Sequence, residues 1–202
     1  MSNRAIPLVD LASFVDGDEA QRAAFVEKIG NAFHNVGFVG VINHGISKEL
    51  IDNFYEYAYE FFRLPTAVKR KYEVKDLAGQ RGYTSFGKEH AKQSKVADLK
   101  EFFQIGQTVA ADHPMKEIYP DNITVSENAD FASTGNELYQ AFERAGGALL
   151  EAISIHLGFG TDYFTNKIKD GNSILRAIHY PPITAEPASA IRAEQHEDIN
   201  LI

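Results

Sequence analysis

The sequence predicts an α+β fold in which helices surround a β core. Helical and strand patterns alternate along most of the chain, and only strand patterns follow Ser173. The chain has 202 residues, of which 44% are hydrophobic, and this suits one globular domain or two small ones. Neither an internal repeat nor a low-complexity tract interrupts it. These observations favour a compact mixed fold over a solenoid or a disordered segment.

Composition excludes several function classes. The chain has no cysteine, so disulfide frameworks, thiolate zinc sites, iron–sulfur clusters and cysteine nucleophiles are ruled out. The formal net charge of -8 argues against extensive binding to nucleic-acid phosphates. The first residues lack the apolar run of a signal peptide, and no apolar stretch is long enough to span a membrane. We therefore expect a cytoplasmic protein with neither nucleic acid nor membrane as a partner.

The first elements alternate strand and helix. Residues 6–11 are short and apolar and contain a proline, which suits an edge strand. Asp18 and Gln21 form a capping pattern, and apolar residues then recur at helical spacing up to residue 36. Residues 38–42 read as a buried strand that ends in the turn residues Asn-His-Gly.

A second helix and an irregular segment follow. Ser47 can cap a helix whose apolar residues form a stripe on one face. Pro65 ends that helix and opens a shorter one, which we expect to run through Lys71. Residues 73–100 are charged and contain several glycines, so we expect a loop with short extended pieces such as 82–84.

The third part combines a strand, a loop and the longest helix. Residues 102–105 predict a strand, and residues 110–132 predict a long surface loop. Thr134 with Glu137 forms a second capping pattern. It predicts a helix that starts there and ends before Gly158.

Strands dominate the end of the chain. A short helix is expected after Thr161, followed by a strand over residues 174–180 that Pro181 stops. Residues 196–202 alternate like a strand with one polar face. The chain stops within this pattern, and we expect a longer protein.

His196 and Asp198 are the sharpest candidates for chemistry. Residues two apart on a strand point to the same face, so the imidazole and the carboxylate converge. They would supply two thirds of the facial triad that holds non-haem Fe(II). With seven histidines in the chain, a His-x-Asp pattern also arises by chance, so a surface or structural pair is the alternative.

Arg176 and Tyr180 share a strand face, because they are four residues apart. A guanidinium in this place could grip a carboxylate with two parallel hydrogen bonds. The alternative is an ordinary buried ion pair with a protein carboxylate, in which Arg176 only supports the fold.

Six segments in order resemble the isopenicillin N synthase-like family of 2-oxoglutarate- and Fe(II)-dependent dioxygenases. Residues 37–46, GFVGVINHGI, resemble the family's GFF-x-V-x-NHGI signature. Residues 6–11 resemble its IPVIDL start, and residues 79–83 contain its GY element. Residues 98–106, DLKEFFQIG, are similar to D-x-KE-x-F-x-IG, and residues 175–182 to the strand before the iron ligands. His196-x-Asp198 then falls where the family places its first two ligands, so the resemblance covers essentially the whole chain.

The resemblance implies a distorted double-stranded β-helix, or jelly roll, that is incomplete here and carries a helix-rich N-terminal extension. The N-terminal dioxygenase region would occupy residues 1–120, and a helix plus the first part of the jelly roll would occupy residues 121–202. The implied reaction is oxidation of a small molecule with O2, coupled to decarboxylation of 2-oxoglutarate to succinate and CO2. The implied cofactor is Fe(II), with 2-oxoglutarate as co-substrate. We also expect a monomer.

The same resemblance assigns roles to single residues. His196 and Asp198 would bind the iron, and Tyr180 would donate a hydrogen bond to a carboxylate of the co-substrate or substrate. Arg176 is not assigned by the resemblance; its shared strand face with Tyr180 makes it the candidate to grip such a carboxylate. The family's third ligand, a distal histidine, and its Arg-x-Ser pair have no counterpart among residues 1–202. We therefore expect the 202-residue chain alone to be inactive.

Two rival functions stay open at this point. One is an oxidase of the same family that uses O2 without 2-oxoglutarate. The other is a non-catalytic jelly-roll binding protein that has lost its iron site. The pattern does not identify the primary substrate, because the family's pocket is built from variable loops.

Overall fold

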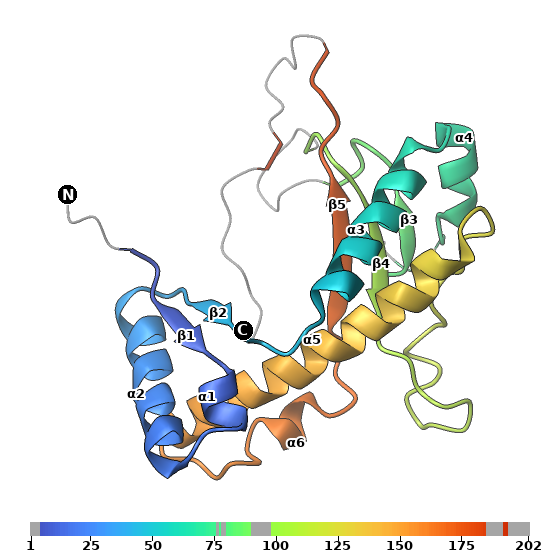
Figure 1. Cartoon of the computed structure of the whole chain (residues 1–202). Helices are drawn as coiled ribbons and strands as arrows, with labels where there is room; N and C mark the ends of the chain where they lie inside the picture. Colours follow the sequence, from blue (N-terminus) through green and yellow to red (C-terminus); the bar gives the residue numbers. More distant parts are fainter. Residues whose placement is uncertain (1–4, 76, 78–79, 90–97, 185–191, 194–202) are drawn as a thin grey trace. The chain divides into compact units, whose positions relative to one another are not determined.

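The chain folds into the mixed helices and strands that its sequence predicts. A computed structural model describes residues 5–75, 77, 80–89, 98–184 and 192–193. The elements in chain order (Figure 1) are β1 (Leu8–Asp10), α1 (Ala12–Val15), α2 (Glu19–Asn35), β2 (Gly40–Ile42), α3 (Lys48–Arg63), α4 (Thr66–Lys69), the 3-10 turn η1 (Arg70–Tyr72), β3 (Gly82–Thr84), β4 (Glu101–Gly106), α5 (Ala129–His156), α6 (Thr165–Ile168) and β5 (Ile174–His179).

The chain forms two compact units. One is built within Met1–Lys48 and Gln140–Gly171, and the other within Glu49–Tyr139 and Asn172–Leu201. Helix α5 contributes its first part to the second unit and the remainder to the first. This division follows contacts in space, whereas the predicted boundary between residues 120 and 121 follows the family pattern and stays a prediction.

The first unit packs α1, α2 and the end of α5 beside a small parallel sheet. β1 and β2 pair with Val9 opposite Val41. The predicted capping box of α2 is confirmed, because the Gln21 backbone N–H donates to Asp18 Oδ1 and the Asp18 N–H donates to Gln21 Oε1, both at 2.9 Å. The fully buried core of this unit consists of Val9, Leu11, Phe14, Phe25, Ile29 and Ala152.

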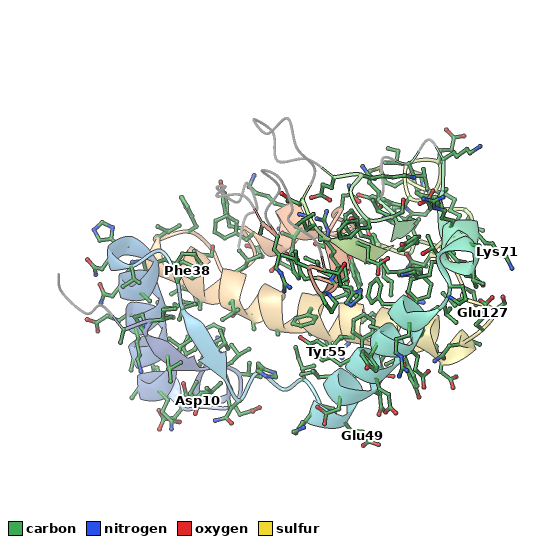
Figure 2. The ribbon with its side chains drawn as sticks, turned by 90° about the horizontal axis from the view of Figure 1, so that it is seen from above. Asp10, Phe38, Glu49, Tyr55, Lys71 and Glu127 are labelled. Atoms are coloured by element: carbon green, nitrogen blue, oxygen red, sulfur yellow. The ribbon has the colours of Figure 1, made fainter. Side chains whose placement is uncertain are left out.

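The second unit contains the antiparallel sheet β3-β4-β5, which α3 and the first part of α5 cover on one side (Figure 1). Phe61 of α3 lies at the centre of an aromatic cluster, and its ring centroid is 5.1 Å from that of Phe103 on β4. The Phe131 ring of α5 lies 5.6 Å from Phe61 and 5.0 Å from Phe103. Side chains fill the space between these helices and the strands, as Figure 2 shows. The aromatic cluster therefore defines a helix-facing side of the sheet.

The start of the helix α5 differs from the prediction. α5 begins at Ala129, so the predicted cap at Thr134 is wrong and the predicted loop 110–132 is too long by a helical turn. Asn128 does the capping, because its side-chain oxygen accepts from the Phe131 N–H at 3.2 Å. Complete burial of Phe131 on the helix-facing side of the sheet holds this first turn in place.

The short helix α1 has no counterpart in the sequence prediction. It begins at Ala12, two residues after Asp10, a β1 residue labelled in Figure 2, whose carboxylate accepts from the Ala12 N–H at 3.1 Å. The Ser13 hydroxyl donates to the Asp10 carbonyl at 2.7 Å. These local hydrogen bonds close one helical turn that is too short to produce a periodic pattern. The strand predicted over residues 196–202 lies outside the described residues.

Candidate functional site

The predicted site residues divide into two pairs. Arg176 lies on β5 and Tyr180 directly follows that strand, whereas His196 and Asp198 lie outside the described residues. Among the residues that the structure describes, no group of three or more histidine, aspartate or glutamate side chains could hold a metal ion. The metal-ligand assignment therefore stays a prediction.

Arg176 lies on the side of the sheet opposite to α3 and α5. Its Nη1 is 3.2 Å from Glu89 Oε1 and 3.3 Å from Glu89 Oε2. The guanidinium also lies over the Phe102 ring, 4.4 Å from the ring centroid. The Arg176 side chain remains 36% exposed, so the expected ion pair with a protein carboxylate is present but is not buried.

Glu89 bridges Arg176 to a second cation, Lys100. The Lys100 Nζ is 3.2 Å from Glu89 Oε1 and 2.9 Å from Asp98 Oδ2. Burial alone would lower the pKa of Lys100, but the hydrogen bonds to Asp98 and Glu89 outweigh it and raise that pKa. Lys100 is therefore protonated, and the Glu89 carboxylate lies between two positive charges.

The helix-facing side of the sheet contains a polar group around the buried Glu101 that we call the Glu101 cluster: Lys69, Tyr83, Glu101 and the partly exposed His179. Lys69 Nζ donates to Glu101 Oε1 at 2.8 Å and to Oε2 at 2.7 Å. The Tyr83 hydroxyl donates to Glu101 Oε2. His179 Nδ1 lies 2.8 Å from Glu101 Oε1, and the His179 ring stacks on Phe62 with ring centroids 5.1 Å apart. The Lys69 and Glu101 side chains are only 7% and 6% exposed.

The electrostatics of the Glu101 cluster keep its carboxyl group ionised. Burial alone would raise the pKa of Glu101, but hydrogen bonds from Lys69, Tyr83 and His179 lower it below its ordinary value. Burial, together with the hydrogen bond to Glu101, raises the pKa of the Tyr83 phenol, so that Tyr83 is neutral. Because an ionised carboxylate only accepts, the proton of the His179 hydrogen bond resides on Nδ1.

Strand register explains why these residues meet. Glu101 lies directly opposite His179, and Tyr83 lies opposite Phe103. Side chains two apart on β4 share a face, so Glu101 points to the same side as the core residue Phe103. Sequence reasoning missed this cluster. The available signal was the charged residue Glu101, which strand alternation places on the same apolar face as Phe103.

Comparisons with known proteins point to one class of enzyme. Residues 6–127 match the family described as non-haem dioxygenase in morphine synthesis, N-terminal. A 2-oxoglutarate-dependent dioxygenase of Aspergillus rugulosus is 30% identical over 96% of this chain and 62% of its own length. Flavanone 3-dioxygenase 2 of Oryza sativa is 30% identical over 100% of this chain and 54% of its own length.

Solved structures show the same similarity. A 2OG-Fe(II) oxygenase family protein from Caulobacter crescentus is 32% identical with a TM-score of 0.79, over 92% of this chain and 59% of that protein. A full-length Neurospora crassa protein in complex with alpha-KG is 26% identical with a TM-score of 0.79, over 98% and 62% of the two chains. The chain spans between 53% and 63% of the length of these curated relatives.

Proposed function

This chain belongs to the non-haem Fe(II)- and 2-oxoglutarate-dependent dioxygenases, and on that premise we propose that the protein oxidises a small molecule with O2 and 2-oxoglutarate and releases succinate and CO2. The observation that carries the proposal is similarity over nearly the whole chain to dioxygenases and to a protein solved with alpha-KG. The predicted α+β fold is confirmed, and the similar oxygenase structures support the jelly-roll assignment.

His196 and Asp198 are the proposed iron ligands within this sequence. Imidazole and carboxylate form the donor set that suits non-haem Fe(II) and leaves positions open for other ligands. Bound Fe(II) would supply the activation of O2 that couples 2-oxoglutarate decarboxylation to substrate oxidation. A distal histidine and an Arg-x-Ser pair would complete the family's site.

Tyr180 and Arg176 are the proposed carboxylate contacts. The Tyr180 hydroxyl would donate a hydrogen bond to the co-substrate or substrate. The Arg176 side chain is 36% exposed, its guanidinium lies over the Phe102 ring, and both contacts with Glu89 are made by Nη1. A second carboxylate could therefore approach the same cation, in competition with Glu89.

A small molecule and O2 are the proposed partners, and a cytoplasmic monomer is the proposed state. Within the part of the chain that the structure describes, no helix is both long and apolar enough to cross a membrane.

The test measures succinate formation by the product of the complete reading frame, supplied with Fe(II), O2, 2-oxoglutarate and a panel of small molecules. Substrate-dependent succinate release supports the proposal, and His196→Ala and Asp198→Ala should each abolish it while leaving the fold intact. Retained turnover in either variant would contradict the ligand assignment. Substrate oxidation without 2-oxoglutarate would instead indicate an oxidase, and absence of Fe(II) binding would indicate a binding protein.

A further inference from the structure

The Glu101 cluster places an ionised carboxylate where the fold alone needs none. Its neighbours on the helix-facing side of the sheet are aromatic, and Phe103 is two residues along the same strand. Replacing a buried ion pair by apolar side chains of similar volume is often neutral or stabilising. Stability of the sheet alone therefore does not explain why the charge is there, and the geometry that the cluster imposes is a second property that it supplies.

The cluster fixes the end of β5 in two ways. Glu101 accepts the hydrogen bond of His179 Nδ1, and the His179 ring stacks on Phe62 at an interplanar angle of 26°. Lys69 connects these two supports, because its Nζ donates to both Glu101 oxygens and to the Phe62 carbonyl at 2.9 Å. The acceptor and the stacking surface under His179 are therefore held by the same ammonium group.

Holding His179 determines the direction of the next side chain. Successive residues of an extended strand point to opposite faces. β5 ends at His179, and continuing its alternation by one residue directs Tyr180 to the opposite side, where Arg176 lies. We infer that Glu101 is a positioning residue that acts through His179 to set the place of the Tyr180 hydroxyl for binding 2-oxoglutarate. This inference rests on the proposed function.

Two substitutions of one residue separate the hydrogen bond from the ring. His179→Phe keeps a ring for stacking on Phe62 but removes the donor to Glu101. His179→Asn removes the ring but keeps an amide N–H close to the place of Nδ1. Ile29→Val is the matched control for lowered stability, because Ile29 is fully buried in the core of the other unit.

The experiment measures the dissociation constant of 2-oxoglutarate by calorimetry, without oxygen and with Mn(II) in place of Fe(II), on the product of the complete reading frame. We expect His179→Phe to weaken 2-oxoglutarate binding about tenfold, because the displaced Tyr180 hydroxyl would lose one charge-assisted hydrogen bond to the 2-oxoglutarate carboxylate. His179→Asn should retain affinity within about threefold, and Ile29→Val should lower the melting temperature without changing affinity. Amide hydrogen exchange of the segment 174–180 should accelerate in His179→Phe, with or without ligand.

The outcomes separate this inference from the function on which it rests. Unchanged affinity in His179→Phe would overturn the positioning role, as would a loss of affinity in His179→Asn equal to that in His179→Phe. Equal loss in Ile29→Val would show that affinity merely follows stability. If the unsubstituted protein does not bind 2-oxoglutarate, the proposed function fails. The hydrogen-exchange result would then still report whether Glu101 anchors β5.

Discussion

Two lysines in the second unit provide a direct test of what burial does to an ion pair. Lys69 and Lys88 each place Nζ 2.7 Å from a glutamate Oε2, in the first case of Glu101 and in the second of Glu73. The side chains of the first pair are 7% and 6% exposed, whereas those of the second are 55% and 23% exposed. The contact distance is the same, so the variants Lys69→Met and Lys88→Met differ mainly in what surrounds the pair.

The expected free-energy changes differ by several-fold. Lys69→Met removes two donors to Glu101 and one to the Phe62 carbonyl, and leaves a buried carboxylate without a cation. Breaking a buried pair in this way costs about 3–5 kcal/mol of unfolding free energy. Lys88→Met removes an exposed pair, which is worth about 0–1 kcal/mol. The difference between the variants should therefore be about 2 kcal/mol or more.

Urea unfolding at neutral pH measures both values. A double variant, Lys69→Met with Glu101→Leu, should recover part of the loss, because no unpaired charge then remains in the core. If Lys69→Met costs no more than Lys88→Met, burial does not control the energetics of this pair, and the reasoning about the Glu101 cluster is refuted.

Three further predictions follow from the same structure. The pKa of Glu101 is lower in the folded protein than in the unfolded chain, so its contribution to stability is present above the unfolded pKa and is lost as pH falls through the folded pKa. Glu101→Gln should therefore weaken the fall of the melting temperature at acid pH. An unchanged fall of the melting temperature would contradict this. Gly147→Ala should stabilise α5 by about 1 kcal/mol, because nothing lies within 4 Å of an added Cβ. Gly135→Ala should destabilise the protein, because its Cβ would lie 2.1 Å from Ile105 Cδ1. If the two variants shift the urea midpoint in the same direction, this contrast is refuted. Arg176→Lys should raise the 2-oxoglutarate or substrate concentration needed for turnover, since an ammonium lacks the planar two-bond grip; a lower melting temperature with unchanged kinetic constants would leave Arg176 structural.

Local patterns predicted the elements that local interactions determine. The Asp18 capping box and the stripe of α3 depend on neighbours three or four residues away, and both are readable from the chain. The start of α5 was misplaced because Thr134 and Glu137 imitate a cap. The true start depends on burying Phe131 against Phe103 of β4, which lies 28 residues earlier in the sequence (131 − 103).

The Glu101 cluster could not be predicted in the same way. Its members come from α4 and three strands, and Glu101 is 78 residues from His179. Only the antiparallel register of β4 and β5 brings these two residues together. The resemblance supplied Tyr180 as a candidate and strand alternation added Arg176, but neither indicated that Glu89 lies on Arg176. His196 and Asp198 remain predictions from sequence.

The first unit is built from two segments that lie far apart in the sequence, and this affects how it folds during biosynthesis. Its core joins Val9 and Phe25 to Ala152, which follows Val9 by 143 residues (152 − 9). At about 5–20 residues per second, a ribosome needs about 7–30 s to supply the missing helix. During that interval the N-terminal apolar side chains have no α5 partner. This unit should therefore complete its folding only after α5 has been synthesised, and a nascent chain arrested before residue 140 should expose these side chains to chaperones.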